Sequence, residues 1–244
     1  MGKKQKNSYE QVYDPPENLD NCPFFGYTLN PEQKIFRDAI WSKDKDIVFC
    51  NAPAGSGKTF VAVATAYLLV QYKRYNGIVY IASPVQEGRQ GYLPGDITEK
   101  SAVYFTPFYD AATKVGLNIN TDLNDNAINS KYGTGFVELI THTFLRGCNI
   151  ENKVVILDEA ENYTREELLK TITRIHDNCK VIVIGHTKQI DLDRPEDSGF
   201  ARYLAWFQLC ERAAVCELKE NYRGWISSHA DAMPADYSIE QQCS

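Results

Sequence analysis

The chain has 244 residues, 43% of them hydrophobic, and a formal net charge of -6 at pH 7. Because this length and composition can bury a sizeable core, we expect one compact domain with loose ends. The negative net charge argues against electrostatic binding of nucleic acid over the whole protein surface, so any nucleic-acid site has to be local.

Seven cysteines are scattered through the sequence without a CxxC pair and without a histidine pattern beside them. This spacing argues against a metal cluster and against a disulfide framework. The sequence also lacks an apolar leader and a run of about 18 apolar residues. We therefore predict a cytoplasmic protein that does not cross a membrane.

The N-terminal part begins with a polar segment and continues into a helix. Residues 1–20 are polar and charged and contain a pair of prolines, which predicts a flexible arm. A helix ending near Ser42 is predicted next, because Asn30 suits the N-cap and Pro31 the first helical position. The residues expected to form its buried apolar stripe are Ile35, Phe36, Ala39 and Ile40.

Short β-rich runs alternate with helical stretches through the rest of the chain. This alternation is typical of a three-layer α/β fold, with a mainly parallel central sheet and helices on both faces. The helix over residues 58–72 is apolar almost all round, which predicts a buried central position. The six predicted strands are Asp46–Cys50, Ile78–Ala82, Val137–Thr141, Val154–Leu157, Lys180–Gly185 and Ala214–Leu218.

Residues 116–135 differ from this pattern because they contain five asparagines and almost no apolar periodicity. We predict a flexible insertion there. The expected organisation is therefore a single domain over residues 21–232 that contains this insertion, followed by a C-terminal tail over residues 233–244.

The segment from residue 47 to residue 59 has the pattern of a strand, a glycine-rich turn and a helix start. Gly55 and Gly57 permit backbone angles that are closed to other residues, so successive N–H groups can converge on phosphate oxygens. Lys58 is expected to reach the β- and γ-phosphates, and the Thr59 hydroxyl to hold Mg²⁺. The pattern G-x-x-x-x-G-K-[ST] is met except that alanine replaces the first glycine. The expected nucleotide-binding residues of this loop are Ala52, Pro53, Ala54, Gly55, Ser56, Gly57, Lys58 and Thr59.

Two carboxylates follow the predicted strand that ends at Leu157. A buried parallel strand can place Asp158 at the carboxyl edge of the sheet, facing the Mg²⁺ beside the phosphates. Glu159 points in another direction and is predicted to orient or deprotonate the attacking water. The alternative is a strand that ends at a solvated acidic turn. The presence of the glycine-rich loop in the same sequence favours the metal site over this alternative.

Five further segments carry distinctive motifs, namely residues 83–96, 106–111, 143–147, 158–164 and 185–191. They contain L-P-G-D, T-P-F-Y-D-A, F-L-R-G, D-E-A-E-N-Y-T and G-H-T-K-Q-I-D. Together with the glycine-rich loop, these segments resemble superfamily-1 helicase cores and, more closely, the PhoH-like ATPases. The corresponding stretches of the PhoH-like family read F/Y-M-R-G, D-E-A-Q-N-x-T and G-D-x-x-Q-I-D. The resemblance spans roughly residues 28–230. It implies a RecA-like P-loop core that binds Mg²⁺ and ATP and hydrolyses the nucleotide.

The resemblance also assigns roles to two glutamines. Gln33 matches the glutamine that reads adenine in this superfamily, with an exposed helix glutamine as the alternative. Gln189 is expected to sense the γ-phosphate by a hydrogen bond that is lost after hydrolysis. His186 replaces the usual aspartate and is interpreted as a loop histidine.

Residues 220–224 resemble the N-Y-R segment of superfamily-1 enzymes, whose arginine stabilises the charge on the transferred phosphate. Because the sequence lacks a second RecA-like domain, we predict a homo-oligomer, a hexameric ring as the family implies, in which Arg223 reaches a neighbour's site. The alternative is a surface arginine in a salt bridge.

Single-stranded RNA or DNA is the expected partner, because helicase-like cores contact single strands through arginines and aromatic side chains. An ATP-driven motor acting on such strands and an ATP-dependent regulatory or assembly module with slow hydrolysis both remain open. The candidates for strand contact, which are otherwise solvated loop residues, are Gln86, Arg89, Gln90, Tyr92 and Arg146.

Overall fold

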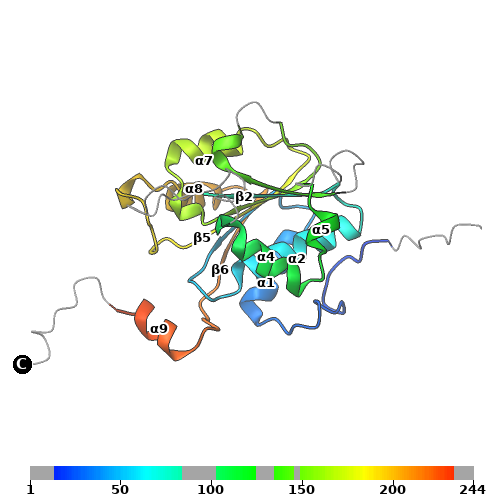
Figure 1. Cartoon of the computed structure of the whole chain (residues 1–244), viewed down its shortest axis with the longest axis horizontal. Coiled ribbons are helices and arrows are strands. Elements are labelled where there is room, and N and C mark those ends of the chain that lie inside the picture. The colour runs from blue at the N-terminus through cyan, green and yellow to red at the C-terminus, as the bar shows by residue number, and fades with distance from the viewer. Residues whose placement is uncertain (1–13, 84–102, 125–134, 146–148, 234–244) are drawn as a thin grey trace, which may run out of the picture.

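A six-stranded sheet forms the centre of the molecule, and helices cover both of its faces (Figure 1). The structure is a computed structural model that describes residues 14–83, 103–124, 135–145 and 149–233. The six strands in this part of the chain are all parallel, in the order β3-β2-β4-β5-β1-β6. Their bounds are β1 Ile47–Asn51, β2 Ile78–Ala82, β3 Val137–Thr141, β4 Val154–Asp158, β5 Lys180–Gly185 and β6 Ala213–Glu217. The predicted α/β fold with a parallel sheet is confirmed.

The strands of this sheet are apolar on both sides because each face packs against helices. Alternate strand residues belong to two separate hydrophobic cores, one on either face. The first core lies under α1 Pro31–Trp41, α2 Lys58–Gln71 and α4 Thr106–Lys114, and it includes the residues on either side of the short helix α5 Ile119–Asp122. The second lies under α7 Arg165–Ile172 and α8 Phe200–Phe207. After β6, α9 Trp225–Asp231 lies apart from both helical layers (Figure 1).

Helix α1 begins as the sequence predicts, with a capping box between Asn30 and Gln33 and a proline in its first turn. Its buried face, however, differs from the predicted stripe. Ile35 is 63% exposed, whereas Arg37 and Trp41 are buried. The reason is that the face toward the core follows residues 33, 36, 37, 40 and 41, and Ile35 lies outside this helical row.

Two segments that read as loose in the sequence are packed in part. Leu19 is buried, and the Trp41 indole N–H donates to the Pro16 carbonyl over 3.1 Å, so residues 14–20 lie against α1. Leu117 and Leu123 are also buried, and the Asn124 N–H donates to the Val137 carbonyl. Residues 116–124 of the predicted insertion therefore belong to the packed domain, whereas residues 125–134 lie outside the described residues.

Candidate functional site

One cavity is enclosed by the glycine-rich loop and first turn of α2, the start of α1, helix α4, the turn after β4 and the segment before α9. Its volume is about 560 Å³. Ligands of α/β proteins bind at the carboxyl edge of the sheet, where strand-to-helix loops converge. The residues that line the cavity are Tyr27, Thr28, Leu29, Gln33, Ala54, Gly55, Gly57, Lys58, Thr59, Phe60, Pro107, Asp110, Ala111, Lys114, Glu159, Tyr222 and Arg223.

The glycine-rich loop adopts the backbone conformation for which the sequence selects glycine. Gly55 has φ +79° and Gly57 has φ +82°, both in the left-handed region. A Cβ at Gly55 would lie 2.7 Å from Cγ of Arg223, so a side chain is excluded for steric reasons as well. Ala52, which replaces the first glycine of the motif, is fully buried, and its N–H donates to the Gly185 carbonyl over 2.9 Å. The departure from the motif therefore sits in the core and leaves the turn itself intact.

Helix α2 begins at Lys58, directly after this turn, so its first N–H groups and its positive dipole end face the cavity. Lys58 is buried and lines the cavity together with Thr59. Gln33 holds the loop from the opposite side: its side-chain amide donates to the Ser56 carbonyl over 2.9 Å and accepts from the Asn30 N–H. Gln33 is only 6% exposed, which rules out an exposed helix glutamine.

Asp158, the last residue of β4, is fully buried and directly precedes Glu159, which lines the cavity. Its Oδ2 accepts from the Thr59 hydroxyl over 3.0 Å and from the Tyr80 hydroxyl, and its Oδ1 accepts from the Glu159 N–H over 2.8 Å. A solvated acidic turn is thereby ruled out. A hydroxyl and a carboxylate in contact form the hard oxygen donor set that suits Mg²⁺, so these residues fit that ion.

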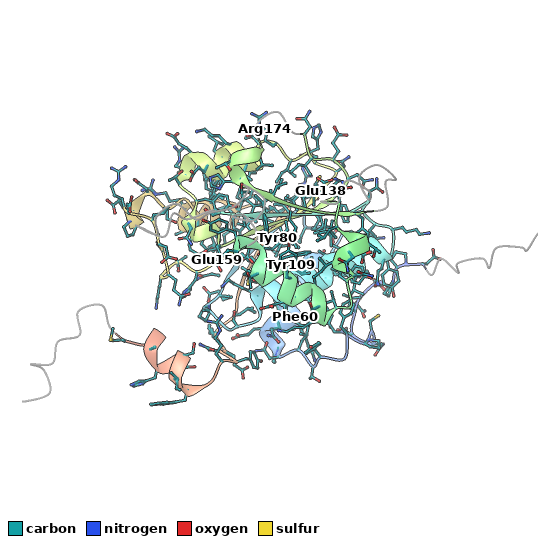
Figure 2. The ribbon with its side chains drawn as sticks, in the orientation of Figure 1. Phe60, Tyr80, Tyr109, Glu138, Glu159 and Arg174 are labelled. Carbon is teal, nitrogen blue, oxygen red and sulfur yellow. The ribbon has the colours of Figure 1, made fainter. Side chains whose placement is uncertain are left out.

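The sequence reasoning missed Tyr80, which comes from β2 and lies near Glu159 between the two helical layers (Figure 2). Burial and the Asp158 charge raise the pKa of Tyr80 well above its usual value, so its hydroxyl remains a donor. In the sequence, Tyr80 is one aromatic residue within an apolar strand, and no local pattern distinguishes it.

Glu159 turns away from Asp158 because its backbone lies in the left-handed region, with φ +51°. This conformation is uncommon for residues other than glycine and is often found at functional sites. Its side chain lines the cavity. Burial, followed by the Asp158 charge, raises the pKa of the Glu159 carboxyl, and the Lys58 charge opposes that rise.

Glu161 is a second residue that the sequence reasoning did not single out. Its side chain is 1% exposed, lies close to Gly185 at the end of β5, and is not among the described residues that line the cavity. Burial and the Glu159 charge raise the pKa of Glu161 to about 9.

The loop after β5 carries the predicted sensor glutamine. Gln189 follows β5, the strand between β4 and β1, and its N–H donates to the His186 carbonyl over 3.2 Å. His186 is buried directly after Gly185. The loop is tied to the end of β1, because the Thr187 N–H donates to the Asn51 side chain. Gln189 is not one of the described residues that line the cavity.

Arg223 lines the cavity of its own chain, although the sequence reasoning expected it to reach a neighbour. The Tyr222 N–H donates to the Gly55 carbonyl over 2.9 Å, which places the segment on the glycine-rich loop. Glu220 accepts from the Asn30 side chain at the start of α1. The predicted strand contacts Gln86, Arg89, Gln90, Tyr92 and Arg146 lie outside the described residues.

Comparisons with known proteins agree on one family. The family model described as "PhoH-like protein" matches residues 27–225. Protein PhoH of Escherichia coli strain K12 is 33% identical over 228 residues, which cover 87% of this chain and 62% of that protein. A PhoH-like protein of Mycobacterium leprae is 34% identical over 197 residues, which cover 79% of this chain and 54% of that protein. The chain thus spans only part of the length of these curated relatives.

Among solved structures, the UvsW helicase from bacteriophage T4 matches with a TM-score of 0.50 at 13% sequence identity. The match covers 77% of this chain and 59% of the helicase chain. At this identity, the likeness establishes a shared helicase-core fold. Within the described residues, no helix combines the length and the apolar character that a membrane crossing requires.

Proposed function

Because the chain belongs to the PhoH-like family of P-loop NTPases, we propose that it is a magnesium-dependent ATPase. One observation carries the proposal. The Thr59 hydroxyl, which lines the cavity together with Lys58 and Glu159, lies 3.0 Å from the fully buried Asp158 carboxylate. Residues separated by 99 positions in the sequence thus supply a metal-ligating pair, a cation and a base at one point.

Each residue of the site has a distinct task in this proposal. The N–H groups of the glycine-rich loop and Lys58 bind the phosphates, because both are donors directed into the cavity. Thr59 and Asp158 would hold Mg²⁺, which neutralises charge on the β- and γ-phosphate oxygens when it is bound. Glu159 accepts the proton of the attacking water, and its raised pKa makes it a stronger base than an ordinary carboxylate.

Arg223 and Gln33 on the cavity, and Gln189 in the loop after β5, supply the remaining groups. Arg223 is assigned to the charge that develops on the transferred phosphate, and its position on its own chain's loop supports action within the subunit. Gln33 is assigned to the base, since it lies on the cavity and braces the loop. Gln189 is assigned to γ-phosphate sensing, because its loop follows the strand between β4 and β1.

We further propose that the protein self-associates and acts on single-stranded RNA or DNA. Large apolar side chains that are at least two thirds exposed, on or after helices α8 and α9, support contacts with other chains. They are Trp206, Leu209, Trp225, Ile226 and Met233. The helicase-core fold supports a nucleic-acid substrate by analogy of fold.

The test is ATP turnover measured with Mg²⁺ or with a chelator, beside the mass in solution, with and without single-stranded RNA and DNA. We expect turnover that requires Mg²⁺ and rises with one of the strands. Turnover that no strand stimulates would favour the regulatory or assembly module instead. An absence of binding to any nucleoside triphosphate would refute the ATPase itself.

A further inference from the structure

We propose that Asn221 is a positioning residue, whose side chain holds the backbone of Arg223 against the glycine-rich loop so that the arginine side chain reaches the cavity. The inference rests on the proposed ATPase function, because it assigns the support of that site's arginine. Asn221 is not among the described residues that line the cavity, whereas Tyr222 and Arg223 are. Its action therefore has to pass through the residues that follow it.

The segment that carries Arg223 has no regular secondary structure. Residues 218–224 connect the end of β6 to the start of α9 and belong to neither a strand nor a helix. At its start, the Leu218 N–H donates to the Asn51 carbonyl over 3.1 Å, and the Lys219 N–H donates to the Glu32 side chain over 2.7 Å. These bonds fix where the segment leaves the sheet, but the course of the chain at Arg223 needs partners of its own.

The side chain of Asn221 closes the turn at Arg223. Its Oδ1 accepts from the Arg223 N–H over 2.8 Å, and its amide nitrogen donates to the Ser227 hydroxyl, also over 2.8 Å. A backbone N–H can be accepted only by the amide oxygen, so this contact also fixes which end of the amide faces Arg223. Asparagine side chains commonly bond the backbone two residues on in this way, which stabilises a tight turn. The conformation of this turn therefore depends on one side chain.

The closed turn lies directly on Gly55 of the glycine-rich loop. An added Cβ at Gly55 would lie 2.6 Å from Asn221 Oδ1, 2.7 Å from Arg223 Cγ and 3.0 Å from Arg223 Cδ. Between these contacts, the Tyr222 N–H donates to the Gly55 carbonyl over 2.9 Å. The amide oxygen that holds Arg223 and the aliphatic stem of Arg223 thus pack against the same glycine. Because the N–H groups of this loop are assigned to the phosphates, the turn fixes the start of the arginine side chain relative to them.

The alternative role for Asn221 is to stabilise the start of α9, where Ser227 lies in the first turn. The N-cap of α9 is Gly224, which has φ +99° and makes no side-chain cap hydrogen bond. However, α9 lies apart from both helical layers (Figure 1), and Trp225 and Ile226 at its start are exposed. An exposed helix is a weak anchor, so we expect the bond to Arg223 to matter more for turnover than the bond to Ser227.

The experiment compares Asn221→Ala, which removes the acceptor, with Asn221→Ser, whose hydroxyl can accept from the same N–H. Asn221→Ala should lower kcat about tenfold, because a displaced arginine is missing at the chemical step. The KM for ATP should change less than about twofold. Asn221→Ser should restore kcat to within about threefold of wild type. Asn178→Ala is the matched control, at an exposed asparagine that accepts from the Asn152 N–H beyond the amino end of β5, and it should match wild type.

Two further variants test whether Asn221 acts through Arg223. Combining Asn221→Ala with Arg223→Ala should lower kcat no further than Arg223→Ala does alone, because residues that act as one unit are not additive. A role in packing alone would instead add to the effect of Arg223→Ala. Ser227→Ala leaves the contact with Arg223 in place and should lower kcat less than about threefold.

Binding of a transition-state analogue gives a readout that does not depend on turnover. ADP with aluminium fluoride resembles the transferred phosphate, so wild type with Mg²⁺ should bind it more tightly than ADP alone. Asn221→Ala should lose about tenfold of this additional affinity, because the arginine is assigned to the charge of the transition state. Its affinity for ADP alone should change less than about twofold, which also shows that the variant is folded.

The outcomes distinguish this inference from the proposed function. An inactive wild type defeats the ATPase assignment. Full turnover in Arg223→Ala leaves the ATPase standing and removes the roles of both Arg223 and Asn221. Where Arg223→Ala is impaired, the role of Asn221 is overturned if Asn221→Ala keeps full kcat, or if Asn221→Ser or Ser227→Ala loses as much kcat as Asn221→Ala. It is also overturned if the double variant is additive, or if Asn221→Ala binds the analogue as wild type does.

Discussion

The two sides of the cavity differ in how firmly the fold holds their side chains. The inner wall contains Lys58 and Thr59 at the start of α2, and the Thr59 hydroxyl donates to the buried Asp158, which accepts hydrogen bonds from three different residues. The outer wall consists of Tyr222 and Arg223, which are exposed and joined to the domain by few hydrogen bonds. A fixed inner wall can hold phosphates and a metal at set distances, whereas an exposed arginine can move into place during turnover.

The largest expected effect is on the inner wall at Lys58. Lys58→Ala should weaken ATP binding by about 100-fold or more, because it removes charge-assisted hydrogen bonds to two phosphates. Titration with a fluorescent ATP analogue measures the effect. Lys170→Ala, at an exposed lysine on α7, is the matched control and should bind as wild type does. Unchanged affinity in Lys58→Ala would mean that the glycine-rich loop is not the phosphate site.

The next effect separates binding from chemistry within the inner part of the cavity. Glu159→Gln keeps the size of the side chain and removes its basicity, so kcat should fall about 1000-fold while ATP affinity changes little. Single-turnover hydrolysis and equilibrium binding measure the two quantities. Equal turnover in the variant and in wild type would remove Glu159 from its role as the base.

The outer wall should affect turnover without affecting stability. Arg223→Ala is expected to lower kcat about 100-fold, because it removes one donor to the developing phosphate charge. The melting temperature should stay unchanged, because the side chain is exposed. Arg202→Ala, at an exposed arginine on α8, is the control.

Mixing Arg223→Ala with Lys58→Ala subunits tests where the arginine acts. Because Arg223 lies on Gly55 of its own chain, we expect no activity above the sum of the two variants. Recovery of activity would assign the arginine to a neighbour's site, as the sequence reasoning anticipated. That result would also make the outer wall a subunit interface.

The same contrast between the walls explains what the sequence predicts well. The parallel strands are buried on both faces, so they read as short apolar runs, and their predicted ends differ from the observed ones by at most one residue. The loop and the acidic pair follow two of these strands, and the strand order places them at one edge. The positive φ angles at Gly55 and Gly57 favour glycine at those positions, so this part of the site can be predicted from the local sequence.

The residues that the sequence reasoning missed depend on long-range contacts. Tyr80 meets Asp158 across 78 positions, and Glu161 gains its raised pKa from burial that only the folded chain provides. Ile35 was assigned to the buried stripe because an apolar residue in a helix usually faces the core. In the folded chain, however, another face of α1 packs against the core and Ile35 is exposed. Leu117 and Leu123 are too widely spaced to reveal a packed segment by periodicity.

The smallest expected effect concerns the support of the inner wall at Tyr80. Its buried hydroxyl donates to Asp158, a charged acceptor, whereas the Tyr163 hydroxyl donates to the neutral Ile81 carbonyl over 3.2 Å. Hydrogen bonds to charged groups contribute about 1.5–3 kcal/mol and neutral ones about 0.5–1.5 kcal/mol. Tyr80→Phe should therefore lower the free energy of unfolding more than Tyr163→Phe does, as urea denaturation without nucleotide and Mg²⁺ would measure. The two substitutions remove the same hydroxyl from equally buried rings, so the acceptor is the main difference. If Tyr163→Phe costs as much as Tyr80→Phe, the carboxylate of Asp158 does not depend on Tyr80, and the inner wall is held by the backbone and Thr59 alone.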